Sequence, residues 1–144
     1  MKKTKTAKPR AHARAVGLRE LAGLARAARL QAFAPFSRFK VGAALRTRTG
    51  EVVTGCNIES ASYGLTMCAE RVALFKAVSE GLRDFDAIVV VADSPRPTAP
   101  CGACRQVMWE LAGDIWVQIV NLHGRTRTLR MSELLPLPFD ARNL

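Results

Sequence analysis

Residues 87–92 read Ala-Ile-Val-Val-Val-Ala, six apolar residues in a row and rich in valine. Such a run is typical of a β-strand that is buried on both faces, because β-branched side chains favour strands and neither face carries a polar residue. A sheet with a strand of this kind needs a layer of structure packed on each side. The run therefore predicts a layered α/β domain.

The segments around this strand have the periodicities of helices and further strands. Apolar residues at helical spacing predict a helix over about 18–33, ended by Pro35. Alternating residues at 39–45 and a turn at Thr49-Gly50 into 52–58 predict a hairpin. The order of elements predicts a mixed, roughly five-stranded sheet covered by helices on both faces. The remaining predicted elements are helices at about 67–79 (N-cap Thr66, stop Gly81) and 102–111, and strands at 87–92, 115–121 and 126–129.

The 144 residues suffice for one core, and the basic charge is concentrated at the start of the chain. Residues 1–16 hold six of the basic side chains and no acidic one, whereas the net charge of the whole chain is +10. This composition predicts a disordered tail over 1–16 and a folded domain over 17–144. A basic arm can contact RNA or an anionic surface, but such runs are usually solvated, so we do not expect a nucleic-acid partner.

The four cysteines, at positions 56, 68, 101 and 104, favour a metal or catalytic role. The first fifteen residues contain no apolar segment typical of a secretory signal, and no stretch is long enough to span a membrane. We therefore expect a cytoplasmic protein, in which a disulfide framework is disfavoured.

Cys101 and Cys104 form a C-x-x-C motif directly after Pro100, at the expected start of a helix. The free amides and the dipole of a helix N-terminus favour the thiolate form that metal ligation requires. Alone, the motif is ambiguous, because redox pairs, half of a structural zinc site and two small buried residues share it.

Cys68-Ala69-Glu70 opens the preceding predicted helix and resolves much of this ambiguity. A third thiolate from Cys68 would leave the fourth tetrahedral position of Zn²⁺ open, as in catalytic sites. Glu70 is close enough to reach a water there without binding the metal. The combination matches the pattern of the zinc deaminases, His or Cys-x-Glu followed by Pro-Cys-x-x-Cys. We predict one Zn²⁺ per chain, held by Cys68, Cys101 and Cys104, with Glu70 as the catalytic proton carrier.

Two neighbouring residues have more than one interpretation. Cys56 is a candidate fourth ligand that would close the site, but its position at a strand end favours a small core residue. Three thiolates give Zn²⁺ a net charge of −1, which opposes the ionisation of a bound water. Arg71, three residues beyond Cys68, can offset this charge by donating to the thiolates, and a surface arginine is an equal alternative.

With these residues located, the chain resembles the small homo-oligomeric cytidine deaminases over about residues 18–140. The resemblance implies a three-layer α/β/α fold and zinc-dependent hydrolysis of cytidine and deoxycytidine to uridine and deoxyuridine, with release of ammonia, in pyrimidine salvage. It also implies a homotetramer with shared active sites. The matching stretches are 34–44, 55–64, 68–71, 100–106 and 133–136, followed by Phe139.

The resemblance further implies how a nucleoside is bound. Asn57 and Glu59 would hydrogen-bond the ribose 3′-hydroxyl, and Phe39 would pack against the pyrimidine. Tyr63 and Phe139 would reach into the site of a neighbouring subunit. Arg71 would bond the ligand thiolates. The substrate-binding residues implied in this way are Phe39, Asn57, Glu59, Tyr63, Ala69 and Phe139.

Two other functions stay open at this point. Deaminases of blasticidin-type nucleoside antibiotics also use a Cys-Ala-Glu motif, although Asn57, Glu59 and Phe139 favour ordinary nucleosides. A non-enzymatic, zinc-stabilised module that binds RNA through residues 1–14 is the alternative from another class. It would have little use for Glu70 or for an open coordination position.

Overall fold

The computed structural model describes residues 16–144. Residues 1–15, which make up nearly all of the predicted basic tail, lie outside the described part of the chain. The division into a tail at 1–16 and a domain at 17–144 therefore stays a prediction.

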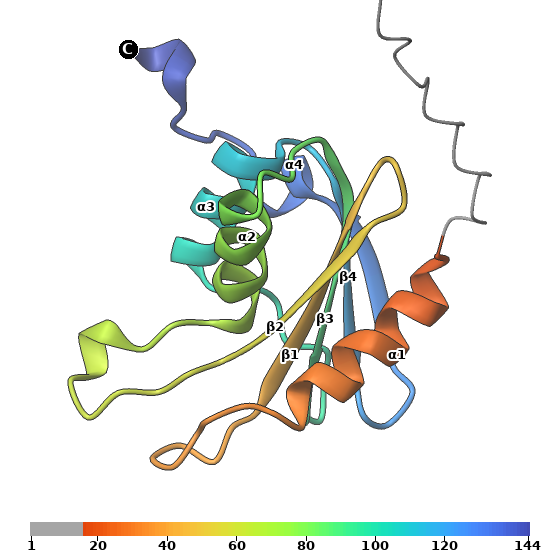
Figure 1. Cartoon of the computed structure of the whole chain (residues 1–144), viewed down its shortest axis with the longest axis vertical. Coiled ribbons are helices and arrows are strands. Elements are labelled where there is room, and N and C mark those ends of the chain that lie inside the picture. Colours follow the sequence, from red (N-terminus) through yellow and green to blue (C-terminus); the bar gives the residue numbers. More distant parts are fainter. Residues whose placement is uncertain (1–15) are drawn as a thin grey trace, which may run out of the picture.

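The described chain forms a five-stranded mixed sheet between two layers of helices (Figure 1). The strand order is β2-β1-β3-β4-β5, in which β3 and β4 are parallel and the other neighbours are antiparallel. The predicted three-layer α/β/α fold is confirmed. The elements are α1 (Leu18–Arg29), β1 (Val41–Thr47), β2 (Val52–Cys56), η1 (Tyr63–Leu65), α2 (Ala69–Ser79), β3 (Phe85–Ala92), α3 (Gly102–Ala112), β4 (Trp116–Asn121), β5 (Thr126–Arg130), α4 (Met131–Leu134) and η2 (Ala141–Asn143).

Strand β3 lies at the centre of the sheet and contributes to both cores. Helix α1 covers one face, where it packs with Val89 and Val91, and α2 and α3 cover the other, where they pack with Ile88 and Val90 (Figure 1). Every residue from 87 to 92 is at most 3% exposed. The valine-rich run is thus the doubly buried strand that its sequence predicts.

Two glycines allow the helices to approach the sheet closely. A Cβ atom at Gly42 in β1 would lie 2.0 Å from the carbonyl oxygen of Ala25 in α1. A Cβ atom at Gly55 in β2 would lie 2.5 Å from the amide nitrogen of Ala73 in α2. Only glycine fits where backbone approaches backbone so closely. Gly55 thereby fixes how near α2, with the residues at its N-terminus, lies to the sheet.

The helix predicted over 18–33 is too long, because α1 ends at Arg29. The last turn tightens, with the amides of Leu30 and Gln31 donating to the carbonyls of Ala27 and Ala28. Phe33 then pairs in parallel with Ile58. This long-range pairing ends the helix before Pro35 does.

Other predicted boundaries shift by a few residues. Strand β1 begins at Val41, so Phe39 precedes the strand rather than opening it. Cys68, not Thr66, is the N-cap residue of α2, and the Thr66 hydroxyl accepts a hydrogen bond from the amide of Ser60 instead. The short helix α4, directly after β5, was not predicted. Within residues 16–144 no helix is long and apolar enough to cross a bilayer.

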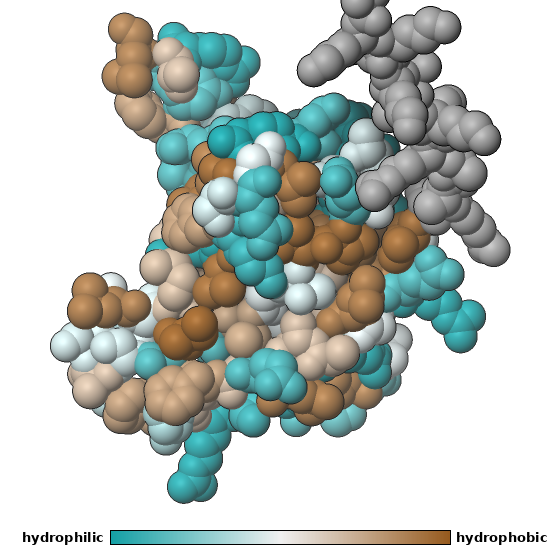
Figure 2. Space-filling model, viewed as in Figure 1, coloured by the Kyte–Doolittle hydropathy of each residue, from teal (hydrophilic) through white to brown (hydrophobic). Residues whose placement is uncertain are grey.

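Apolar side chains remain exposed on the loops that follow α1 and β2. Figure 2 shows hydrophobic residues gathered at this lower left corner of the molecule. We call this region the apolar loop surface. It comprises Leu30, Phe33, Phe36, Ile58, Tyr63 and Leu65.

Candidate metal centre and active site

Three cysteines converge where α2 and α3 begin. Cys68 is the N-cap residue of α2, Cys101 is the N-cap residue of α3, and Cys104 lies in the first turn of α3. Their sulfur atoms all lie within 4.8 Å of one another. Both helix N-termini point their free amides and positive dipole ends at this group, which favours thiolates. The structure thus brings together the three residues predicted as ligands.

The thiol group has the geometry of a zinc site. Tetrahedral Zn²⁺ with Zn–S bonds of about 2.3 Å places two sulfur atoms roughly 3.8 Å apart. The Sγ atoms of Cys68 and Cys101 are 3.9 Å apart. Within residues 16–144 no fourth ligand joins the three cysteines, and three thiolates with an open position form the donor set of a catalytic zinc site. Cys56 lies outside this group, half-buried at the end of β2, as expected for a residue that is not a ligand.

The thiols differ in how readily they lose a proton. A hydrogen bond with Cys104, together with Arg71, lowers the pKa of Cys68 to about 5. The same contact with Cys68, aided by burial, raises the pKa of Cys104. The low pKa of Cys68 favours the thiolate form that metal ligation requires.

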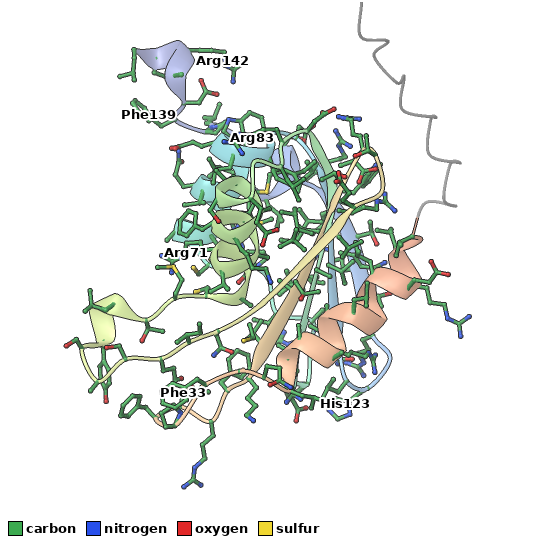
Figure 3. All side chains as sticks on the ribbon, viewed as in Figure 1. Phe33, Arg71, Arg83, His123, Phe139 and Arg142 are labelled. Atoms are coloured by element: carbon green, nitrogen blue, oxygen red, sulfur yellow. The ribbon has the colours of Figure 1, made fainter. Side chains whose placement is uncertain are left out.

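Arg71 lies against the thiols rather than in solvent. Its Nη2 atom donates to the Sγ atom of Cys68 at 3.4 Å, and Figure 3 shows the side chain projecting from α2 at the site. Its Nε atom is buried and has no hydrogen-bond partner among the described residues. The guanidinium is therefore placed to offset thiolate charge, the first of its two sequence interpretations.

Glu70 is a buried carboxyl group beside the thiols. It is 5% exposed and lies in the first turn of α2. Burial, reinforced by the charge of Cys68, raises its pKa to about 7. A carboxyl group with a pKa near neutrality can both accept and donate a proton at working pH. This environment suits the proton carrier that the motif predicts.

A pocket of about 170 Å³ opens beside the cysteines and is lined mainly by apolar atoms. Its size suits one small ring rather than a large ligand. The predicted site residues that line it are Phe39, Asn57, Cys68, Ala69, Glu70 and Cys101. Further lining residues that the motifs did not reveal are Val41, Thr66, Val90, Ala92 and Thr98, and Ala99 lies beside them.

Asn57 fixes the backbone at the mouth of this pocket. Its Oδ1 atom accepts from the amide of Val41 at 2.8 Å, and its Nδ2 atom donates to the carbonyl of Phe39 at 2.8 Å. Asn57 is 8% exposed, so these bonds are shielded from water. The amide thus holds Phe39 at the pocket, and it keeps one donor and one acceptor position for a ligand.

Glu59 lies next to the pocket rather than in it. It lines a neighbouring cavity of about 410 Å³ together with Phe36, Ser37 and Tyr63, and Thr66 borders both cavities. The Ser37 hydroxyl and the amides of Phe36 and Ser37 donate to its carboxylate, and they lower its pKa. Glu59 is therefore held as an anion at the rim.

Tyr63 and Phe139 do not reach the pocket of their own chain. Tyr63 is 76% exposed and packs edge-on against Phe36, with ring centroids 6.0 Å apart. Phe139 is 58% exposed on the C-terminal segment, well away from Arg71 in Figure 3. The segment is held to α3, since the Gln106 side chain donates to the carbonyl of Phe139 at 2.7 Å. Both aromatic rings are available to other molecules.

Comparison with known proteins agrees with this geometry. The family model of the cytidine and deoxycytidylate deaminase zinc-binding region matches residues 17–119. A cytidine deaminase of Halalkalibacterium halodurans is 58% identical over 118 residues, which cover 81% of this chain and 89% of the relative. A blasticidin-S deaminase of Bacillus cereus is 37% identical over 111 residues, covering 72% of this chain and 79% of the relative.

Solved structures give the same result. The crystal structure of a cytidine deaminase from Burkholderia pseudomallei matches with a TM-score of 0.83 at 52% identity, covering 84% of this chain and 98% of that one. A cytidine deaminase from Mycobacterium tuberculosis matches with a TM-score of 0.75 at 40% identity, covering 86% and 98%. Sequence, fold and the thiol group agree, and the chain belongs to the cytidine and deoxycytidylate deaminase family of zinc-binding proteins.

Proposed function

We propose that this protein hydrolyses cytidine and deoxycytidine to uridine and deoxyuridine, releasing ammonia. The observation that carries the proposal is Glu70, a buried carboxyl group with a pKa of about 7 beside three convergent thiols at one pocket. A module that only bound RNA would have no use for such a group. The identity of 58% to a cytidine deaminase supports the same reaction.

The chemistry divides between a metal ion and Glu70. Bound by Cys68, Cys101 and Cys104, Zn²⁺ would lower the pKa of a water molecule and so supply a nucleophile at neutral pH. Glu70 accepts the two protons of the attacking water in turn at its carboxylate, and it returns one to N3 of the ring and the other to the amino group that leaves C4 as ammonia. One water is consumed, and the base becomes uracil. The guanidinium of Arg71 compensates part of the negative charge of the three thiolates.

The two adjoining cavities suit the two halves of a nucleoside. The pyrimidine would occupy the 170 Å³ pocket between Phe39 and Ala69, with its reactive carbon toward Glu70. The ribose would extend past Thr66 toward Glu59, with the 3′-hydroxyl between the Asn57 amide and the Glu59 carboxylate. An anion at the rim suits a hydroxyl donor such as the 3′-hydroxyl of a nucleoside. The proposed substrates are therefore nucleosides.

The exposed aromatic residues support an oligomer. The apolar loop surface and Phe139 would be costly to leave in water, and such patches mark interfaces. We propose a homotetramer in which Tyr63 and Phe139 complete a neighbour's site, acting in cytoplasmic pyrimidine salvage. Light scattering should give four times the chain mass, and a monomer with full activity would rule out shared sites.

Deamination of blasticidin-type antibiotics is the second candidate, because a blasticidin-S deaminase is 37% identical. The test compares the two substrate classes directly. Purified, zinc-loaded protein is mixed with cytidine, deoxycytidine or blasticidin S, and conversion is followed by ultraviolet absorbance. We expect turnover of both nucleosides, lost after treatment with a strong chelator and restored by Zn²⁺. Turnover of blasticidin S without turnover of either nucleoside would make antibiotic deamination the function and would contradict cytidine deamination.

A further inference from the structure

The loop between β3 and α3 forms one wall of the pocket. Thr98 and Ala99 line the pocket, and the loop leads directly into the ligand Cys101. Pro95, Pro97 and Pro100 have no amide hydrogen to donate. Within the described chain, residues 94–100 form no hydrogen bond from main chain to main chain. This wall is therefore positioned by side chains.

Asn121, at the end of β4, holds the start of the loop. Its Nδ2 atom donates to the carbonyl oxygens of Ser94 at 3.1 Å and Pro95 at 3.3 Å. Its Oδ1 atom accepts from the amides of His123 at 3.0 Å and Arg125 at 2.9 Å. The side chain is fully buried, and both halves of its amide are saturated. The four partners fix its orientation, because exchanging oxygen and nitrogen would break all four bonds.

Hydrogen bonds continue from this anchored end to the pocket. The Thr98 hydroxyl donates to Oγ of Ser94 at 2.8 Å, and the Ser94 hydroxyl donates to the carbonyl of Arg96 at 2.6 Å. Ser94 thus connects the carbonyl that Asn121 holds to a side chain of the pocket wall. At the other end, Nε of Arg105 donates to the carbonyl of Pro100 at 2.8 Å. The two anchors hold different parts of the loop, and Asn121 is the one joined to Thr98.

We propose that Asn121 is a positioning residue for pyrimidine binding, which sets the place of the Thr98–Ala99 wall through Ser94 without touching the substrate. The proposal rests on the proposed function, because it takes the 170 Å³ pocket as the pyrimidine site. A buried amide that satisfies carbonyls of a loop without hydrogen bonds from main chain to main chain fixes one loop position among many. A shift of the wall weakens its contacts with a ring that must fit closely.

The variant Asn121→Asp separates the two halves of the amide. An aspartate keeps an acceptor for the amides of His123 and Arg125, but it places an oxygen against the carbonyls of Ser94 and Pro95. We expect the KM for cytidine and the inhibition constant of uridine to rise at least about tenfold, the scale of losing a buried hydrogen bond. Zinc content should stay at one ion per chain, because Arg105 still holds the loop at Pro100.

The control is Val117→Ala, in the same strand. Val117 is fully buried in the core on the side of α2 and α3, and it lies at the far end of β4 from Asn121. Val117→Ala should lower the melting temperature, but it should leave the KM for cytidine and the inhibition constant of uridine unchanged. If Asn121→Asp also lowers only the melting temperature, Asn121 has a merely structural role and the proposal is wrong.

A second variant covers the case in which Asn121→Asp does not fold. Ser94→Ala removes only the link between the anchored carbonyl and Thr98, and it should raise the same two constants about threefold. Unchanged constants in Ser94→Ala would overturn the proposal. Wild-type protein that neither binds uridine nor converts cytidine would instead overturn the proposed function, so the two failures are distinguishable.

Discussion

Nη2 of Arg71 lies 3.4 Å from Sγ of Cys68, so a cation on α2 contacts the residue that caps the same helix. The three-residue spacing alone is equally compatible with a solvated arginine. The buried Nε atom, with no partner in residues 16–144, shows that the side chain turns inward. With zinc bound, its charge would offset the negative charge of the thiolates, which opposes ionisation of a water molecule at the metal.

Loss of this cation should weaken both metal binding and turnover. Arg71→Gln is expected to lower zinc affinity and kcat by about 10- to 100-fold, the usual effect of removing a partner of a metal ligand. Zinc retained after dialysis against a chelator and initial rates with cytidine measure the two effects. Arg83→Gln is the control, because among the described residues exposed Arg83 donates only to nearby main-chain carbonyls. Equal zinc retention in the two variants would contradict the role of Arg71.

The ligand set predicts the result of deleting one thiol. Cys101→Ala leaves two sulfur donors, too few to hold zinc against a chelator. We expect less than one tenth of the zinc content of the wild type and no measurable turnover, determined by metal analysis of purified protein. Cys56→Ala, which removes a cysteine outside the cluster, should retain one zinc per chain. One tight zinc in Cys101→Ala would mean that the ligands are different residues.

Substitutions of two glycines should have separate effects on the free energy of unfolding and on zinc affinity. Gly42→Ala forces α1 away from the sheet and should cost about 1–3 kcal/mol of unfolding free energy, while sparing zinc binding. Gly55→Ala forces away α2, which begins at Cys68, and should lower zinc affinity as well. Denaturant unfolding and zinc titration measure the difference. Gly23→Ala, on an exposed helix position with open space around it, should not destabilise. Identical zinc affinity in the Gly42 and Gly55 variants would contradict the role of Gly55 in positioning the N-terminus of α2.

Recognition of the ribose should depend on Glu59. Glu59→Gln weakens the acceptor for the 3′-hydroxyl, so the KM for cytidine should rise about tenfold or more. The KM for 3′-deoxycytidine, which lacks the hydroxyl, should change little, so the ratio of the two constants isolates the contact. If both constants rise together, Glu59 acts only by holding the loop at Phe36 and Ser37.

The features predicted correctly from the sequence depend on short stretches of chain. The doubly buried strand follows from six consecutive apolar residues, and the thiol group follows from two motifs that each open a helix. The features that were predicted wrongly or not predicted at all depend on distant partners. Helix α1 ends early because Phe33 pairs with Ile58. Asn121 contacts Ser94 and Pro95, which precede it in the chain by 27 and 26 positions. Periodicity and motif spacing contain no information on such contacts.

The aromatic residues show a further limit of sequence patterns. Phe39 lines the pocket although it precedes the strand in which it was expected. Tyr63 and Phe139 do not line the pocket of their own chain, and their contact with a neighbouring subunit stays a prediction. A sequence pattern does not distinguish a core aromatic residue from one that contacts a second copy of the chain.

The most direct test compares wild-type protein with Glu70→Gln, both loaded with zinc, on cytidine. Glutamine has nearly the same shape as glutamate, so zinc content and uridine binding should be unchanged. It cannot, however, accept and return protons. Absorbance at the cytidine band should fall with the wild type, and the variant should be slower by about 10⁴-fold, because every proton transfer passes through this carboxyl group. Near-normal turnover by a zinc-loaded Glu70→Gln variant would contradict the account.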